Sequence, residues 1–484
     1  MSKATQVLVV GGGPAGSTAA TLLAREGLDV TIIEKEVFPR YHIGESLLPS
    51  CLSIMDLLGV RGKVDAYGFQ LKRGAYFDWG GEQWDTIFSN NQPGYSYQVL
   101  RSDFDQLLLE HAKSQGVSVL EGVEVKRLKF DGARPRIAVW SPVGRDGRTQ
   151  EQETGFDFLI DASGRAGLMT TRHLHTRRYN EAFKNIAVWG YWKGAKELSA
   201  GPEGAVAICS VPDGWFWGIP LQDGNLSVGL VTHKEIFKSK RNEGLSPDRI
   251  YHEAIHECPA IADLLTSAEL TTPLRIEQDY SYTSERFTGP GYFLVGDAAC
   301  FLDPLLSTGV HLATYSAMLA GASLASVFRG EVSEEEARDL YERNYRQAYL
   351  RLFAVVSKLY QQYNGKDSYF WEAQRLTLRD CSAADVKQAF VNVISGTEDL
   401  WDAQATLELA MENAGDALTE AQKLSSLRNE KTLDSISPHE RELMEARAAF
   451  LKLAMTLVPG EAKGLYVVTK PRLGLARQTA QDVR

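Results

Sequence analysis

The chain begins with two apolar runs separated by a helical pattern of small residues. Residues 6–10 (QVLVV) are almost continuously apolar, as expected of a strand buried on both faces of a parallel sheet. Residues 17–25, rich in Ala and Leu, predict a helix that ends at Gly27, and a second strand follows at 29–33. The N-terminus is therefore predicted to form a strand–helix–strand unit.

A different pattern fills residues 187–233, where short alternating runs are separated by glycines and by PDG and DGN turns. It predicts an antiparallel sheet, which we expect to form the floor of a substrate cavity, joined by strand pieces at 75–79 and 95–100. Trp215 and Trp217 lie two positions apart in this region, so their indoles point to one face of a strand. Ordinary aromatic packing in a sheet would account for the pair taken alone.

From about residue 331 the pattern becomes helical and charged. Ser333 followed by Glu336 predicts a capping box at the start of a helix. Residues 419–445, rich in Glu, Lys and Ser, indicate a solvated helix with a loose connection.

Length, charge and cysteine usage narrow the class of protein. The 484 residues exceed the usual size of one domain, so two or three structural units are expected. A net charge of −10 argues against nucleic acid as a partner. The five cysteines are scattered, without metal-ligand spacing, which argues against a disulfide framework and a metal site. A secretory signal pattern and a run of about 18 apolar residues are not found, so we expect a cytoplasmic protein without a membrane partner.

The turn after the first predicted strand carries a dinucleotide-binding pattern. Gly11, Gly13 and Gly16 have GxGxxG spacing between a strand and a helix. Gly11 permits the tight turn, Gly13 lets the backbone approach a pyrophosphate, and Gly16 allows close packing of helix on sheet. Glu34, at the end of the second strand, is placed to accept a ribose hydroxyl. The pattern therefore predicts a bound dinucleotide.

Two later stretches favour FAD over NAD as that dinucleotide. Residues 156–165 form an apolar strand that ends in small residues, and residues 291–313 form a strand that leads to Asp297 and then a long helix from Gly309. Asp297 is placed to hydrogen-bond a ribityl hydroxyl, and the helix N-terminus can hold the pyrimidine end of the flavin. A second nucleotide-binding pattern is not found, so we expect a separate NAD(P)H-dependent flavin reductase to supply the reduced flavin.

The GxGxxG motif with Glu34, Arg101 in YQVLRSDFD, and the stretch LVGDAACFLDP together resemble the FAD-dependent aromatic hydroxylase superfamily. The resemblance implies that Arg101 reaches the flavin phosphates. From the sequence alone, Arg101 could equally be a solvated neighbour of Ser102, which is expected to cap a helix over 103–115.

Four further stretches narrow this resemblance: FPRYHIGESLLPS, GFQLKRGAYFDWG, the WxWxIP pattern at 215–220, and DPLLSTGVH. Together they resemble the flavin-dependent halogenases, in particular the branch that acts on phenols, pyrroles and tyrosyl groups. The resemblance runs from Val7 to about residue 330 and more loosely into 367–375. Residues 158–194 look closest to enzymes of this branch that chlorinate phenolic polyketides.

This resemblance implies a mechanism with two separated half-reactions. Reduced FAD and O₂ would give a C4a-hydroperoxide, which a chloride or bromide ion would attack to form a hypohalous acid. The tryptophan strand would keep the organic substrate away from the flavin. Lys72 would hydrogen-bond the oxidant or form a chloramine, and so direct the halogen to an aromatic carbon. If these motifs were incidental, Lys72 would be a solvated strand-edge lysine like Arg73.

The residues implied in each role are as follows. The cofactor-binding residues are Gly11, Gly13, Pro14, Ala15, Gly16, Glu34, Lys35, Arg40, Ser46, Arg101, Asp297, Pro304, Gly309 and Val310. The barrier residues are Trp215, Trp217, Ile219 and Pro220, the halide-binding residues are Ser307, Thr308 and Gly309, and the catalytic residue is Lys72.

One position departs from the tryptophan-type halogenases. Those enzymes carry a glutamate two residues before the threonine of the halide loop, and this chain has Leu306 there. A phenol activates its own ring, so the substitution favours a phenolic or pyrrolic substrate over free tryptophan. Candidate phenol activators are Tyr76, Tyr97, His42, His111 and His311.

The fold expected from these observations is α/β. A Rossmann-like FAD-binding domain of the aromatic hydroxylase type is expected over 1–180 and 275–330, an antiparallel substrate-side sheet over 60–100 and 181–274, and a helical C-terminal region over 331–484.

The expected activity is FADH₂-dependent halogenation of a small aromatic substrate in natural-product biosynthesis. The alternatives are a flavin-dependent hydroxylase or reductase of the same fold, a non-catalytic flavoprotein, and a halogenase that acts on a tyrosyl or pyrrolyl group tethered to a carrier protein.

Overall fold

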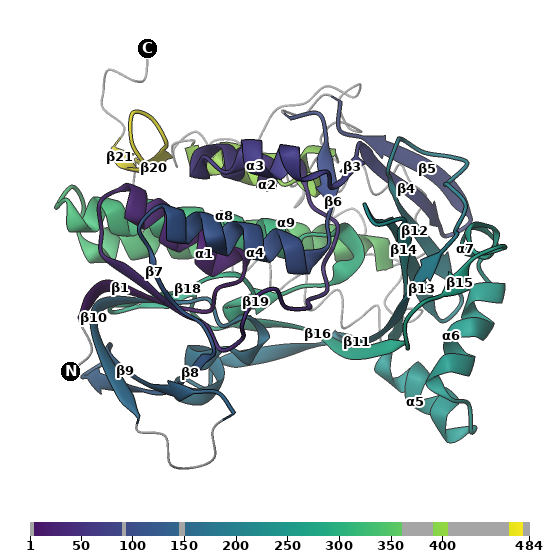
Figure 1. Ribbon diagram of the computed structural model, residues 1–484, viewed down its shortest axis with the longest axis horizontal. Coiled ribbons are helices and arrows are strands. Elements are labelled where there is room, and N and C mark those ends of the chain that lie inside the picture. Colours follow the sequence, from purple (N-terminus) through teal and green to yellow (C-terminus); the bar gives the residue numbers. More distant parts are fainter. Residues whose placement is uncertain (1–3, 90–92, 145–150, 361–390, 405–463, 478–484) are drawn as a thin grey trace, which may run out of the picture.

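The computed structural model describes residues 4–89, 93–144, 151–360, 391–404 and 464–477. The stretches 367–375 and 419–445, which the sequence analysis singled out, lie outside these residues. Two large sheets with helices beside them make up most of the described part (Figure 1).

The first sheet has eight strands and contains the predicted N-terminal unit. Its main path is β17 (Thr288–Gly289), β18 (Tyr292–Leu294), β10 (Gln152–Asp161), β1 (Thr5–Val10), β2 (Val30–Ile33) and β7 (Ser118–Leu120), extended by β8 (Val123–Asp131) and β9 (Arg134–Pro142). The four central pairings along this path are parallel, with β1 between β10 and β2. The carboxyl ends of β1, β2 and β10 therefore meet at one edge, where ligands bind in folds of this class.

Helices lie on one side of this sheet (Figure 1). They are α1 (Pro14–Arg25), α2 (Pro49–Leu58), α3 (Arg61–Tyr67), α4 (Arg101–Ser114), α8 (Gly309–Phe328) and α9 (Glu334–Tyr360). The first of them begins three residues earlier than predicted, because Pro14 has the backbone angle that suits the first helical position. The α2 and α3 helices pack on the other helices. The α8 helix packs against α1 and α9. Within the described residues it is the one helix long and apolar enough to cross a membrane, and 94% of its apolar window is buried inside the protein.

The second sheet has nine strands. Its main path is β19 (Cys300–Phe301), β16 (Arg275–Ser284), β11 (Arg177–Lys193), β14 (Asn225–His233), β13 (Gly214–Pro220), β12 (Val206–Val211), β4 (Gly74–Trp79) and β5 (Glu82–Ile87), and β15 (Glu269–Leu270) pairs with β11. The pairings among β11, β12, β13 and β14 are antiparallel, which confirms the prediction for 187–233. The helices α5 (Lys234–Asn242), α6 (Pro247–His256) and α7 (Pro259–Leu264) lie beside it (Figure 1).

Two details of this sheet differ from expectation. The piece at 75–79 joins it through β4, but 95–100 does not, because β6 (Ser96–Gln98) pairs with β3 (Gln70–Lys72) in a separate two-stranded sheet. In addition β16, which the expected boundary at 275 assigned to the flavin-binding part, is hydrogen-bonded to β11 of the second sheet. The division into domains stays a prediction.

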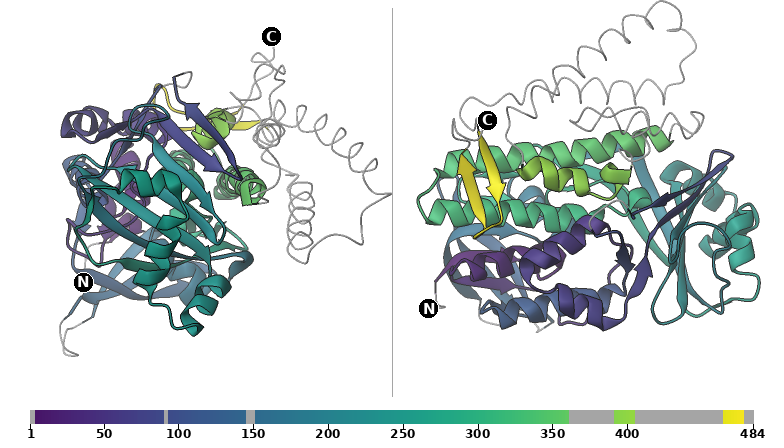
Figure 2. Two further views of the ribbon diagram at one scale, coloured as in Figure 1. Left: turned by 90° about the vertical axis from the view of Figure 1, so that its right-hand side faces the viewer. Right: turned by 90° about the horizontal axis from the view of Figure 1, so that it is seen from above.

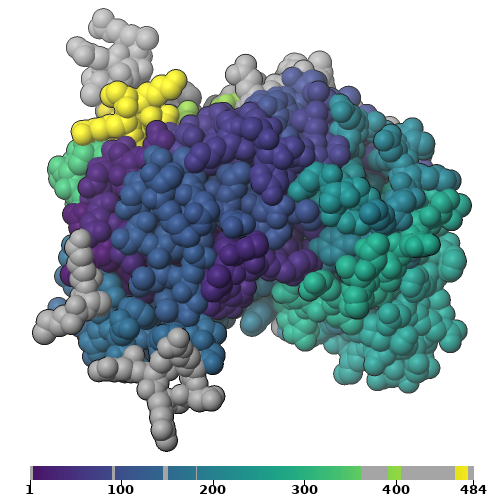
Figure 3. Space-filling model, in the orientation of Figure 1, coloured from purple at the N-terminus to yellow at the C-terminus, as the bar shows by residue number. Residues whose placement is uncertain are grey.

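The described part of the C-terminal region consists of α9, α12 (Thr397–Gln404) and a hairpin of β20 (Leu465–Val468) and β21 (Gly474–Arg477). The capping box is confirmed, since Ser333 Oγ accepts from the Glu336 amide at 3.2 Å and Glu336 Oε2 accepts from the Ser333 amide at 2.9 Å. The hairpin was not predicted. It lies on the surface at the end of the molecule opposite the second sheet (Figures 2 and 3).

Candidate functional site

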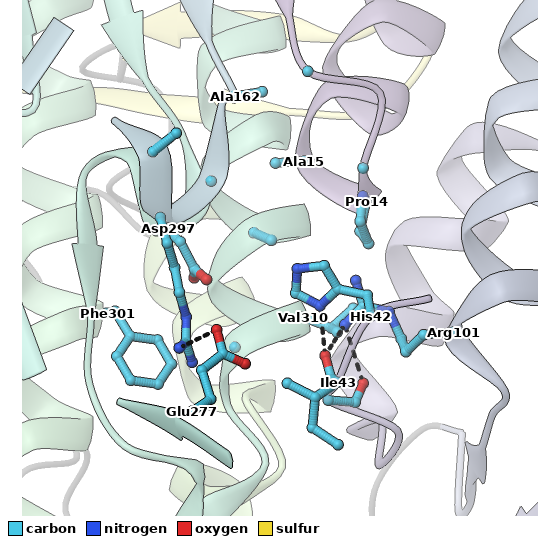
Figure 4. Close-up of a pocket in the computed structure, with 18 of the residues that line it drawn as sticks. Pro14, Ala15, His42, Ile43, Arg101, Ala162, Glu277, Asp297, Phe301 and Val310 are labelled. Atoms are coloured by element: carbon cyan, nitrogen blue, oxygen red, sulfur yellow. Dashed lines mark hydrogen bonds and ion pairs between the residues drawn. The ribbon is translucent and has the colours of Figure 1, made fainter. Parts of the chain in front are cut away.

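A cavity of about 440 Å³ lies where the two sheets meet. That volume is in the range of cofactor and ligand sites. In Figure 4, Asp297 and Phe301 lie on one side of the cavity. His42 and Arg101 lie on the opposite side.

Most of the predicted cofactor-binding residues line this cavity. They are Gly11, Gly13, Pro14, Ala15, Glu34, Lys35, Arg40, Ser46, Arg101, Asp297, Pro304, Gly309 and Val310. Gly16 is not among the lining residues. A Cβ atom there would stand 1.9 Å from the Gly11 carbonyl oxygen, so Gly16 serves the packing of α1 against the turn.

The turn between β1 and α1 fits a dinucleotide. Gly11 has a φ of +106°, and a Cβ on it would stand 2.2 Å from the Ala162 carbonyl oxygen, so only glycine fits. Gly13 precedes the first turn of α1, whose amide N–H groups face the place that a pyrophosphate would take. Glu34 accepts from the Gly12 amide at 2.6 Å and from the Glu36 amide at 2.8 Å, which fixes its carboxylate at the cavity wall. These residues fit FAD.

Arg101 is buried, so the alternative of a solvated residue is wrong. Its guanidinium donates to both oxygens of Asp105, at 2.8 and 2.9 Å, and to the Ile43 carbonyl at 2.7 Å. The predicted cap is also wrong, because α4 begins at Arg101 itself, and the Ser102 hydroxyl contacts Asp103 within the helix.

The tryptophan strand is β13. Trp215, Trp217 and Ile219 line the cavity, whereas Pro220 does not. Phe216 points to the other face, where its ring lies 5.9 Å from that of Tyr251. The ring centroids of Trp215 and Trp217 are 6.2 Å apart, and Trp79 and Trp189 extend the group at 6.4 and 6.3 Å. These four indoles form a wall, which we call the tryptophan wall.

Lys72 is 1% exposed and lies outside the cavity lining. Its Nζ donates to Ser46 Oγ at 2.7 Å and to the Leu47 carbonyl at 3.0 Å, and lies 5.5 Å from the Phe88 ring centroid. Burial lowers the pKa of Lys72 to about 7. The interpretation as a solvated lysine is therefore wrong, and Ser46, which does line the cavity, connects the amine to it.

The loop before α8 holds the predicted halide residues. Ser307, Thr308 and Gly309 all line the cavity, and α8 begins at Gly309 directly after Thr308. Ser307 has a φ of +58°, an uncommon backbone conformation for a residue other than glycine. Leu306 is buried and adds no titratable group to the loop.

Asp303 anchors this loop to the tryptophan wall. One carboxylate oxygen accepts from the Leu305 amide at 2.9 Å, and the other accepts from the Tyr360 hydroxyl at 3.0 Å. The Tyr360 oxygen accepts in turn from the Trp215 indole N–H at 2.8 Å. Sequence reasoning missed Tyr360 because 145 residues separate it from Trp215.

Of the five candidate phenol activators, His42 lines the cavity. Burial, and next the positive charge of Arg101, lower the pKa of His42 to about 4. The others lie elsewhere: Tyr76 in the core of the second sheet, Tyr97 against Asp65, His111 against Lys63 and Leu58, and His311 between two buried side chains of other helices.

Glu45 is a cavity residue that sequence reasoning did not include. Its Oε1 accepts from the Tyr191 hydroxyl at 2.6 Å, and burial raises the pKa of its carboxyl to about 7. A carboxyl between Gly44 and Ser46 was visible in the sequence, but its burial depends on Tyr191, 146 residues away.

Comparison with known proteins identifies relatives of this site. The model of the tryptophan halogenase family matches residues 6–94 and 88–435. A tryptophan 2-halogenase of Chondromyces crocatus is 45% identical over 100% of this chain and 96% of its own length. The sulochrin halogenase of Aspergillus terreus is 36% identical over 87% of this chain and 81% of its own length. A solved structure, the myxobacterial chondrochloren halogenase, is 34% identical with a TM-score of 0.69 over 86% of this chain and 97% of its own.

The cofactor that these relatives require, FAD, is the one that the residues of the cavity fit. Enzymes of this kind use FAD, a halide and O₂, and generally need a separate flavin reductase. The family model, the relatives over the full chain and the fold agree. The chain therefore belongs to the tryptophan halogenase family and is a flavin-dependent halogenase.

Proposed function

We propose that this halogenase acts on an electron-rich, phenolic ring and that Lys72 directs the electrophilic halogen to it. The observation that supports this proposal most strongly is the burial of Lys72, whose amine is separated from the cofactor cavity only by the side chain of Ser46. A lysine whose only role was to keep a strand edge soluble would be exposed, because burial in the interior disfavours the charged form of its amine.

The chain separates cofactor from substrate. When bound, reduced FAD together with O₂ supplies the oxidation that turns a halide into an electrophilic halogen. Trp215, Trp217 and Ile219 keep the organic substrate away from the flavin, while the amide N–H groups at Thr308 and Gly309 suit a small anion. Ser46 is the contact through which Lys72 meets the cavity wall.

The amine of Lys72 suits an electrophilic halogen. With a pKa of about 7 it is largely neutral at slightly alkaline pH, and its lone pair is then able to accept a hydrogen bond or to bind a halogen atom. Ser46 Oγ and the Leu47 carbonyl fix two directions around the nitrogen and so orient the lone pair. The ring gains the halogen and loses one proton.

A phenolic ring is favoured by the apolar loop beside the helix. Leu305 and Leu306 are apolar, so neither position offers a carboxylate to take the ring proton. The substrate's own hydroxyl must then activate the carbon that reacts. Free tryptophan is the second candidate, because the 45% identical relative is named a tryptophan 2-halogenase.

The test is mass spectrometry of reactions that contain the protein, FAD, a flavin reductase with NADH, and either NaCl or NaBr. The substrates are a panel of phenols, free tyrosine, free tryptophan, and tyrosyl and pyrrolyl groups on a carrier protein. A phenol whose added mass and isotope pattern follow the halide supports the proposal. Halogenation of tryptophan alone would overturn the phenolic assignment, and a gain of one oxygen under either halide would point to hydroxylation.

The same assay tests the role of Lys72. Lys72→Met should reduce halogenated product at least about 100-fold while the reduced flavin is still consumed. The matched control is Arg73→Met, since Arg73 is exposed and paired with Glu203. Full product from Lys72→Met would exclude a direct role for the amine.

A further inference from the structure

Three buried side chains join the first turns of α2 and α8 to α12. The Ser50 hydroxyl lies 2.9 Å from His311 Nδ1, and His311 Nε2 lies 2.8 Å from Asp399 Oδ2. Ser50 belongs to α2, His311 to α8 and Asp399 to α12. We call this group the Ser–His–Asp link.

The link has the residue types of a hydrolytic triad but not its accessibility. The side chains of Ser50, His311 and Asp399 are at most 1% exposed, and none of the three lines the cavity. The backbone of Gly396 covers the hydroxyl, since a Cβ there would stand 2.4 Å from Ser50 Oγ and 2.5 Å from His311 Nδ1. Because no substrate reaches Ser50, the link has a positioning role and not a nucleophilic one.

The charge at the acidic end of the link follows from an ion pair. Arg351 of α9 pairs with both Asp399 and Asp402. Burial raises the pKa of Asp399, but the guanidinium of Arg351 outweighs burial and holds that pKa below its ordinary value. The His311 ring lies between this carboxylate, at Nε2, and the Ser50 hydroxyl, at Nδ1, so it connects the charged end of the link to α2.

Each end of the link leads to one half of the proposed reaction. Ser50 lies in the first turn of α2, three residues after Leu47, which together with Ser46 holds Lys72. His311 lies in the first turn of α8, two residues after Gly309 of the halide loop. The Ser50 amide also donates to the Ser395 carbonyl at 3.2 Å, so the segment before α12 is fastened to the same turn.

We propose that Ser50, His311 and Asp399 are positioning residues that set the distance between the halide loop and the segment holding Lys72. The inference rests on the proposed function, because it takes the loop at Thr308 and Gly309 as the halide site. Through Asp399, α12 of the C-terminal region would influence the reaction without contacting substrate or cofactor.

The test uses the full-length protein loaded with oxidised FAD and titrated with NaBr, with flavin fluorescence as the signal. Ser50→Ala and His311→Gln are each expected to raise the Kd for bromide about fivefold, the effect of one ordinary hydrogen bond. The KM for bromide should rise similarly, product per reduced flavin should fall, and the Kd for FAD should stay within about twofold. The double variant should be little worse than either single one, since both break the same link.

Ser323→Ala is the matched control. Ser323 is equally buried on α8, but its hydroxyl faces the Ala337 carbonyl of α9 at 3.4 Å and not the cavity end of the helix. It should lower the Tm without changing the Kd for bromide.

Variants Ser50→Ala and His311→Gln that lower the Tm but leave the Kd and KM for bromide unchanged would overturn the inference. Ser50→Ala removes a single oxygen atom and decides the matter even where His311→Gln does not fold. If wild type forms halogenated product but variants at Thr308 and Gly309 bind bromide with an unchanged Kd, the inference alone is overturned. If wild type forms no halogenated product, the proposed function is overturned as well.

Discussion

Lys72 and Arg73 are neighbours in the chain, yet their charges lie in opposite surroundings. Arg73 pairs with Glu203 at the surface, with 48% of its side chain exposed. Lys72 points inward and has two oxygen atoms as acceptors but no carboxylate among the partners found in the described residues. This alternation is the ordinary geometry of an extended chain, and here it separates a solvated cation from a buried amine.

The burial of Lys72 predicts a dependence of stability on pH. The unfolded lysine titrates near 10.5 and the folded one near 7, so between these values the unfolded chain binds one proton more. The free energy of unfolding therefore rises with pH through this window. Relative to Lys72→Met, wild-type stability should increase by about 2–3 kcal/mol between pH 7 and pH 9.

Urea unfolding of wild type, Lys72→Met and Arg73→Met at the two pH values provides the measurement. The difference between wild type and Arg73→Met should be the same at both pH values, because Arg73 does not change charge there. A pH-independent difference for Lys72→Met would mean that the folded lysine keeps an ordinary pKa.

At the scale of elements, we expect the turn between β1 and α1 to contain one glycine needed for folding, Gly11, and one needed for the cofactor, Gly13. Gly11→Ala places a Cβ against the Ala162 carbonyl at a positive φ and should cost at least about 2 kcal/mol of stability. Gly13 has a φ of −68°, and a Cβ there meets only the Arg40 side chain, at 3.2 Å. Gly13→Ala should fold normally but raise the Kd for FAD about tenfold or more, since the methyl group stands where the pyrophosphate approaches.

Thermal unfolding of the apoprotein and FAD titration measure the two effects separately. Gly27→Ala is the control, because Gly27 also has a positive φ, +85°, but no atom within 4 Å of an added Cβ. It should cost about 1 kcal/mol and leave FAD binding intact. Equal losses of FAD affinity in Gly11→Ala and Gly13→Ala, at equal stability, would contradict this division of roles.

The sequence predicted those features that are determined by residues close together in the chain. The strand, turn and helix around Gly11 to Gly16 follow from neighbouring residues, and so does the shared face of Trp215 and Trp217 on β13. The pairing of β6 with β3 was not predictable, because a short polar strand fits either sheet equally well.

The site residues that the sequence analysis missed are determined by contacts between residues far apart in the chain. His311 and Asp399 are 88 residues apart, and neither has a neighbour in sequence that indicates the link between them. Glu45 and Tyr360 were missed likewise, because burial and hydrogen bonding at those positions depend on β11 and β13. Motifs thus predicted many residues that line the cavity, but also Gly16, Lys72 and Pro220, which do not line it. The tertiary structure decided how all of them are held.

At the scale of the whole molecule, the chain returns after α12 to the end of α8 that lies far from the cavity. The Leu473 amide donates to Glu26 at the end of α1 at 3.0 Å, and the Leu475 amide donates to Ser326 of α8 at 2.8 Å. Arg329 joins the same corner by pairing with Glu26 at 2.8 Å. The β20–β21 hairpin thus closes the core at the end opposite the second sheet (Figure 2).

This arrangement predicts that the hairpin stabilises the fold without shaping the site. Leu475 is 6% exposed and packs in the main core, so Leu475→Ala should lower the free energy of unfolding by about 2–4 kcal/mol. The hairpin contributes no residue to the cavity lining within the described part of the chain, so the Kd values for FAD and bromide should be unchanged well below the Tm. Val37→Ala, at a 68% exposed position, is the control and should leave stability within about 0.5 kcal/mol. If Leu475→Ala weakened FAD or bromide binding while the protein is still folded, α8 would be transmitting strain along its length from the hairpin to Gly309, and the two ends of the molecule would be mechanically coupled.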